Sequence, residues 1–203
     1  MKQVVLGLAL LALVLPIAAR ADGIDLTNRF GTVTILDTGI TSRGSELISF
    51  NGIQAPKGHS LGTVNFATGA LASGSIWTGG TFSDVGSSFL ISGRGGYGEP
   101  KGIIFNGTFV GPINWAIVGT HGNYTVIYQL TGNIAGQLYP GRIGTGTTTQ
   151  NIYTYKDQEI IDHKGNIKLG QTHLNTPEPS TLGLLGSGLI TIAGMLRRKA
   201  LAK

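Results

Sequence analysis

Two short glycine-rich segments contain residues that could do chemistry. Gly58-His59-Ser60-Leu61-Gly62 fits the G-x-S-x-G pattern, in which a tight turn between a strand and a helix exposes a serine hydroxyl to a histidine base. The next residues, Thr63 to Phe66, have a strand pattern where that mechanism requires a helix. We therefore expect no catalytic residues and no enzyme, and a secreted serine esterase using Ser60 is the lesser alternative.

The second segment, Gly93-Arg94-Gly95-Gly96-Tyr97-Gly98, fits G-x-G-x-x-G. In dinucleotide-binding proteins these glycines let backbone amides approach a pyrophosphate at the start of a helix. Here Glu99-Pro100-Lys101 leads into another strand pattern, so we interpret the segment as a loop between strands. Arg94 and Tyr97 are candidate ligand contacts, because an aromatic ring with a cation suits sugar rings and their carboxylates.

Metal and cofactor sites find no support in the pattern. The chain has no cysteine, and its four histidines are too far apart in the sequence for a zinc site. The acidic residues between 157 and 162 are the densest group, but they lack the loop pattern of a known calcium site. The sequence therefore predicts no metal and no cofactor.

The two tryptophans suggest a route to ligand binding. Trp77 and Trp115 lie in strand-like runs near several phenylalanines, and large aromatic residues in strands most often belong to the core. If either faced solvent beside exposed tyrosines, it would form a platform for polysaccharide. A carbohydrate-binding module that uses surface aromatics is therefore the first alternative function.

The elements that must position these residues are strands. Apolar residues between Asp22 and Thr176 fall into short runs rich in Val, Ile, Phe, Tyr and Thr, separated by Gly and Asn. In the segment from Tyr124 to Leu130, the apolar residues at even positions alternate with Thr, Ile and Gln. This is the period of two expected when one face of a strand is buried. The fold class is all-β, an antiparallel sandwich or barrel-like ectodomain, and a parallel solenoid is less favoured because no repeat of fixed length is found. The expected strands are 32–36, 47–50, 60–66, 75–78, 88–92, 102–109, 113–118, 124–130 and 150–155.

The end of the ectodomain is more polar. Asp162-His163-Lys164-Gly165-Asn166 has the composition of a hairpin turn. We expect it to join Glu159–Ile161 to Ile167–Leu169, so that this hairpin forms the last edge of the sheet. Residues 171–176 would then be a linker.

The charge distribution argues against a nucleic-acid partner. The formal net charge is +5, but Asp22 to Thr176 contains nine basic and nine acidic residues. The excess lies in the two terminal segments, so a cationic face for nucleic acid is not expected.

The amino terminus has the features of a secretory signal peptide. Lys2 precedes an apolar run from Val4 to Leu15, and Ala19 and Ala21 provide small residues for signal peptidase. We expect Sec-type export and cleavage after Ala21, whereas an uncleaved anchor is the alternative.

The carboxy terminus has the features of a second targeting signal. Pro177-Glu178-Pro179 precedes seventeen residues without formal charge, 180–196, and then Arg197-Arg198-Lys199. A helix over the uncharged run would be roughly 25 Å long, the short end of a transmembrane span. The basic cluster would stay on the cytoplasmic side and fix the orientation. A plain membrane tail would share the span and the basic end, but would not need Pro-Glu-Pro.

These last residues resemble a PEP-CTERM sorting signal of exopolysaccharide-producing Gram-negative bacteria. The resemblance covers about 27 residues and implies a membrane-embedded exosortase that cuts near Pro-Glu-Pro. It says nothing about what the exported part does.

The expected organisation is a signal peptide (1–21), a β-rich ectodomain (22–170), a linker (171–176) and a sorting signal (177–203) with a single transmembrane helix over 180–196. We expect an inner-membrane intermediate held by the carboxy-terminal helix, and then a location at the cell surface or in the extracellular matrix of a Gram-negative bacterium. The expected role is structural or adhesive in an exopolysaccharide or biofilm matrix, with polysaccharide as a candidate partner.

Overall fold

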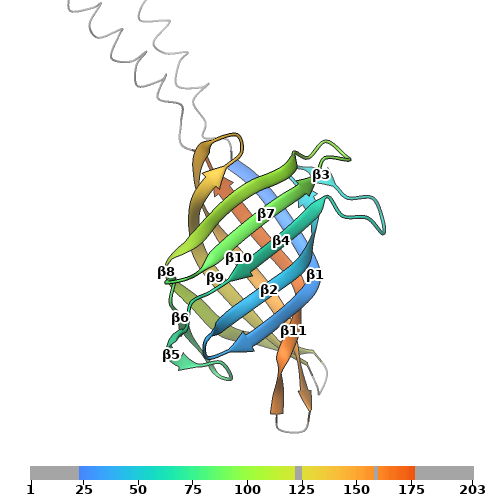
Figure 1. Ribbon diagram of the computed structural model, residues 1–203. Coiled ribbons are helices and arrows are strands. Elements are labelled where there is room, and N and C mark those ends of the chain that lie inside the picture. Colours follow the sequence, from blue (N-terminus) through green and yellow to red (C-terminus); the bar gives the residue numbers. More distant parts are fainter. Residues whose placement is uncertain (1–22, 122–124, 158–159, 177–203) are drawn as a thin grey trace, which may run out of the picture. The chain divides into compact units, whose positions relative to one another are not determined.

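A computed structural model describes residues 23–121, 125–157 and 160–176 (Figure 1). Residues Gly23–Thr176 form a unit of their own. The described residues contain strands and no helix, as the sequence predicts. In chain order the strands are β1 Gly23–Leu36, β2 Gly39–Phe50, β3 Ile53–Gln54, β4 Gly62–Ala67, β5 Leu71–Ser75, β6 Gly79–Phe82, β7 Ser88–Arg94, β8 Lys101–His121, β9 Thr125–Leu138, β10 Arg142–Asp157 and β11 Ile160–Asn175.

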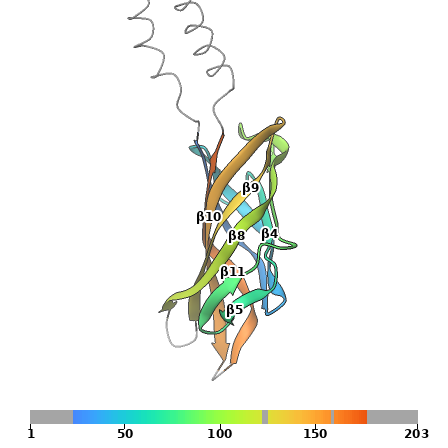
Figure 2. The ribbon, with the colours of Figure 1, turned by 90° about the vertical axis from the view of Figure 1, so that its left-hand side faces the viewer.

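Eight of these strands form a closed antiparallel barrel. β1, β2, β4, β7, β8, β9, β10 and β11 each pair with the next in this order, and β11 pairs with β1. Figure 2 shows β8, β9 and β10 side by side in this wall. β3 pairs only with the end of β2, and the β5–β6 hairpin joins the sheet through β8. Of the two architectures that the sequence leaves open, the protein adopts the barrel.

The end of the sheet differs from the prediction. Residues 162–166 lie within β11 rather than in a turn, and Gly165 pairs with Thr154 and Val33. A side chain at Gly165 would meet the Tyr153 carbonyl oxygen at 2.5 Å, so this glycine permits close strand approach. β11 closes the barrel instead of forming an edge, and residues 171–175, expected as linker, are its last paired residues.

Two other predicted boundaries also move. The runs 102–109 and 113–118 belong to one strand, β8, whose register with β9 shifts between Val110 and Asn114. Gly111 lies in this shift with a φ of 74°, a conformation that glycine adopts without a Cβ clash. The strand predicted at 75–78 is wrong, because Ser75 is the last residue of β5 and residues 76–78 form the turn between β5 and β6.

The interior follows the alternation of the strands. Val126, Tyr128 and Leu130 of β9 are buried, while the residues between them are half-exposed. Phenylalanines from β4, β7 and β8 meet mainly edge to face inside the wall. A barrel of eight strands has an interior that side chains can fill.

The barrel has a terminal end and a distal end, which differ in the connections that they carry. The terminal end is where β1 begins and β11 finishes, because Gly23 pairs with Asn175. The connections β2–β4, β7–β8 and β9–β10 lie at the same end. The distal end carries the β1–β2 turn and the β4–β7 connection.

The β5–β6 turn packs against aromatic side chains of the barrel wall. The Trp115 indole N–H donates to the Ile76 carbonyl oxygen at 2.9 Å, and the Tyr128 hydroxyl donates to that of Trp77 at 2.9 Å. The Trp115 and Tyr128 rings stack with centroids 4.4 Å apart. Burial raises the pKa of Tyr128 to about 12, so its hydroxyl remains a donor at neutral pH.

A row of polar residues crosses the closure of the barrel. Asn28 of β1 and Gln150 of β10 are both opposite Gly170 of β11 in register. Their amides meet across that glycine, with Asn28 Nδ2 3.0 Å from Gln150 Oε1. Asn28 also donates to Ser45 at 2.7 Å, and Gln150 donates to Thr148 at 2.9 Å. All of these side chains are buried, so each hydrogen bond replaces one that water would otherwise make.

Gly170→Ala is predicted to destabilise the barrel. A Cβ at this position would lie 2.0 Å from Gln150 Oε1 and 2.2 Å from Asn28 Oδ1, so both amides must move and lose hydrogen bonds. We expect the free energy of unfolding, measured by urea denaturation, to fall by about 2–4 kcal/mol.

The matched control is Gly119→Ala on β8. Its added Cβ would meet only Ile127 Cδ1, at 3.9 Å, so we expect a change within about 0.5 kcal/mol. Equal effects of the two substitutions would contradict a specific role for the row.

Candidate functional site

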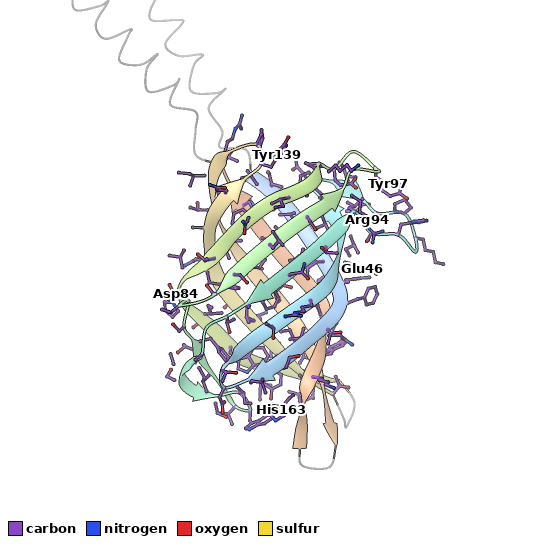
Figure 3. All side chains as sticks on the ribbon, viewed as in Figure 1. Glu46, Asp84, Arg94, Tyr97, Tyr139 and His163 are labelled. Carbon is purple, nitrogen blue, oxygen red and sulfur yellow. The ribbon has the colours of Figure 1, made fainter. Side chains whose placement is uncertain are left out.

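The two glycine-rich segments singled out in the sequence lie side by side at the terminal end. The backbone N–H of Arg94 donates to the Leu61 carbonyl oxygen at 2.8 Å. The His59 and Tyr97 rings meet edge to face with centroids 6.1 Å apart. The structure thus brings together two segments that sequence reasoning treats separately, and Figure 3 shows Arg94 and Tyr97 on this side of the barrel.

Ser60 does not sit on an exposed elbow. Its side chain is buried, and the chain continues through Leu61 into strand β4. The predicted turn followed by a strand is what the structure has. A nucleophile elbow needs an exposed hydroxyl at the start of a helix, so this geometry offers no support to esterase chemistry at Ser60.

The segment from Gly93 to Gly98 connects β7 to β8, as predicted. Its backbone amides are occupied by the protein's own carboxylate, because Gly96 N–H donates to Glu99 Oε1 and Tyr97 N–H donates to Glu99 Oε2, both at 2.9 Å. These amides are therefore not free to bind a phosphate group. Arg94 and Tyr97 are both exposed around this internally held loop.

Glu99 is a residue that sequence reasoning missed. Its side chain is 4% exposed. Burial raises the pKa of the Glu99 carboxyl, but hydrogen bonds from the backbone N–H groups of Gly96, Glu99, Tyr97 and Gly95 outweigh this and hold the pKa below its ordinary value. The available signal was a carboxylate at the end of a glycine-rich loop, directly before Pro100.

The tryptophans do not form a surface platform. Trp115 is buried in the core, as expected for a large aromatic residue in a strand. Trp115 therefore lacks the exposed face that stacking on a sugar ring requires. Because its side chain is buried, Trp115 is no longer a candidate ligand contact. Trp77 is half-buried, and its ring lies 5.0 Å from that of His163.

The outer wall of β1, β10 and β11 has a polar depression of about 360 Å³. The polar side chains that line it are those of Asp25, Thr27, Thr147, Thr149, Gln171, Thr172 and His173. A second depression of about 170 Å³ on β8, β9 and β10 shares Thr147 and Thr149. Hydroxyl and amide groups on a sheet surface are able to exchange hydrogen bonds with sugar hydroxyls.

The pKa of His173 is raised at this depression. Its Nδ1 lies 2.7 Å from Asp25 Oδ1, and its Nε2 lies 2.9 Å from Asn175 Oδ1. The hydrogen bond to Asp25 raises the pKa of His173, partial burial lowers it, and the Asn175 oxygen adds to the rise. Sequence reasoning missed this pair, since Asp25 and His173 meet only through the β1–β11 register.

Metal ligands are not gathered in the described part of the chain. Within residues 23–121, 125–157 and 160–176, no group of three or more His, Asp or Glu side chains is placed to hold a metal ion.

Comparison with known families identifies the segment that follows the barrel. Residues 175–199 match the PEP-CTERM protein-sorting motif. The chain carries a PEP-CTERM sorting motif. This motif marks an exported protein that is sorted by an exosortase. No curated protein and no solved structure matches the chain.

The PEP-CTERM motif begins where β11 finishes, at Asn175. Pro177, Glu178, Pro179 and the basic cluster at 197–199 lie outside the described residues, as do Ala19 and Ala21 of the expected signal peptidase site. In the part of the chain that the structure describes, no helix has the length and apolar character needed to cross a membrane. The expected helix over 180–196 lies outside that part.

Glu99→Gln is predicted to weaken the β7–β8 loop in a pH-dependent way. An amide presents only one acceptor oxygen, so one backbone N–H loses its partner. At pH 7 we expect the free energy of unfolding to fall by about 1–2 kcal/mol. Because the folded-state pKa is lowered, the carboxylate stabilises the fold above its ordinary pKa of 4.5, and this is lost as the pH falls through the folded-state value.

Urea denaturation at pH 7 and at pH 3 tests this prediction. The difference between Glu99→Gln and the unmodified protein should shrink at the lower pH. Glu46→Gln, at a half-buried position on β2, is the control, with an expected change within about 0.5 kcal/mol. A difference that does not depend on pH would refute the proposed role of the carboxylate.

Proposed function

We propose that this PEP-CTERM protein is a structural or adhesive component of the cell surface or of an extracellular polysaccharide matrix. The observation that carries the proposal is the position of the motif, which begins at the last residue of the strand that closes the barrel. Cleavage near Pro177 would free the whole barrel, because all eight of its described strands end before the cut.

The character of the barrel supports a non-catalytic role. Its interior is filled by apolar and hydrogen-bonded side chains, and the β5–β6 turn packs against Trp115 and Tyr128. Its outer wall is polar and rich in threonine along β10. A stable module with a polar, hydrogen-bonding exterior suits a hydrated polysaccharide matrix.

Carbohydrate binding is the second candidate function. The site that supports it is the polar depression of the outer wall beside Thr147, Thr149 and Gln171, rather than a platform of surface aromatics. Binding there would depend on hydroxyl and amide groups, because both ring nitrogens of His173 already contact Asp25 and Asn175. A serine esterase that uses Ser60 is the least favoured alternative. Labelling of Ser60 by a fluorophosphonate probe would support it.

The route to the exterior is also a proposal. Signal peptidase would cut after Ala21 following Sec-type export. The uncharged run 180–196 would hold the protein in the inner membrane of a Gram-negative cell, with Arg197, Arg198 and Lys199 on the cytoplasmic side. Exosortase would then act near Pro-Glu-Pro.

Mass spectrometry of the exported protein tests this proposal. We expect the mature chain to start at Asp22 and to end between Pro177 and Pro179. Replacing Pro177, Glu178 and Pro179 together by alanine should leave the full tail and keep the protein in the membrane fraction, whereas Ser187→Ala in the uncharged run should be processed normally. An exported pool with intact tails, or normal processing of the triple variant, would contradict exosortase sorting.

A further inference from the structure

The terminal end of the barrel exposes apolar side chains. Tyr139 is 64% exposed in the β9–β10 turn, and Tyr97 is 45% exposed in the β7–β8 loop. Ile143 is 69% exposed and Ile103 53%. Figure 3 shows Tyr139 and Tyr97 at this end, while His163 lies at the other. Large exposed apolar side chains gathered at one place indicate a contact surface.

Cations surround these side chains. Lys57, Arg94, Lys101 and Arg142 are all exposed and lie in or beside the connections of the terminal end. Among the described residues, the only ion pair joins His173 to Asp25, so none of these cations is neutralised by a carboxylate there. Glu99, the nearest acidic residue in sequence to two of them, directs its carboxylate to backbone amides.

The distal end has a different character. It also exposes aliphatic side chains, including Leu36 and Val85. Its described charges, however, are mixed, because Asp37 and Asp84 lie in its connections and Lys164 lies in the first part of β11, and neither of the exposed tyrosines lies there. Tyrosine combined with unpaired cations is the combination that proteins place at the headgroup level of a membrane.

The chain beyond the barrel determines which surface the terminal end can reach. β11 finishes at Asn175, and the uncharged run begins at Ser180. Five residues span at most about 18 Å when fully extended. While that run is in the bilayer, the terminal end is therefore held within about one headgroup layer of the membrane surface.

We infer that, before the tail is cut, the terminal end of the barrel lies on an anionic lipid surface. Tyr139 and Tyr97 then sit at headgroup level, and Arg94, Lys101, Lys57 and Arg142 face anionic headgroups. The inference rests on the proposed membrane anchoring of residues 180–196. Its consequence is that Pro-Glu-Pro is presented at a fixed height, and that the barrel leaves the surface once the tail is removed.

Fluorescence quenching by spin-labelled lipid tests this inference. The chain has no cysteine, so Tyr139→Cys can carry a single environment-sensitive fluorophore, and Thr38→Cys in the distal β1–β2 turn is the matched control. The protein is purified with its tail from cells that lack exosortase and is placed in vesicles of phosphatidylcholine and phosphatidylglycerol. We expect at least a twofold greater quenching by headgroup-proximal doxyl lipid at position 139 than at position 38.

Charge reversal tests the role of the cations. Arg94→Glu with Arg142→Glu should abolish the excess quenching at position 139. Arg29→Glu with Arg43→Glu, at exposed positions on the wall, carries the same change in charge and should leave it intact. High salt should reduce the excess, because exposed charges are screened.

The outcomes separate the two proposals. If the protein does not float with the vesicles, the membrane anchoring fails, and the inference fails with it. If it floats but positions 139 and 38 are quenched equally, anchoring stands and the lipid contact of the terminal end is overturned. Excess quenching that both charge-reversed pairs retain equally would overturn the role given to the cations.

Discussion

The pairing of β1 with β11 is the constraint on which the rest of the structure depends. These strands are the first and last of the barrel, and without their register the wall would be an open sheet with two long edges. The row Asn28, Gly170 and Gln150 lies across this closure, with glycine leaving the space in which two buried amides meet. A shift of one residue would turn these amides outward and expose the apolar residues of both strands.

Closure also creates the features that bear on function. It brings Asp25 beside His173 at the polar depression of the outer wall. It places the first residues of β1 and the last residues of β11 at one end, where two glycine-rich segments and four unpaired cations also lie. The same register that seals the core therefore decides which surface is nearest to the tail. The barrel is complete before the motif begins, so removal of the tail leaves its hydrogen bonds in place.

The sequence predicts the all-β class, the alternation around Tyr128, the core position of Trp115 and the sorting motif. Each of these depends on the composition or the hydrophobic period of a short segment. Prediction from the sequence fails where one residue type is compatible with two kinds of local structure. Gly165 suggests a turn, but here it permits close strand contact. Gly111 suggests a break, but here it forms a shift within β8. The Asn28–Gln150 and Asp25–His173 contacts join residues more than a hundred positions apart. They depend on the register of strands that are distant in the sequence, which no local pattern predicts.

Native-state hydrogen exchange of the mature exported protein tests the closed barrel most directly. The account predicts that amides of β1 and β11 on either side of Gly170 exchange only through global unfolding, with the same opening free energy as the amides shared by β8 and β9. Exchange of the β1–β11 amides at a clearly lower opening free energy, while β8 and β9 stay protected, would show an open sheet and contradict the account.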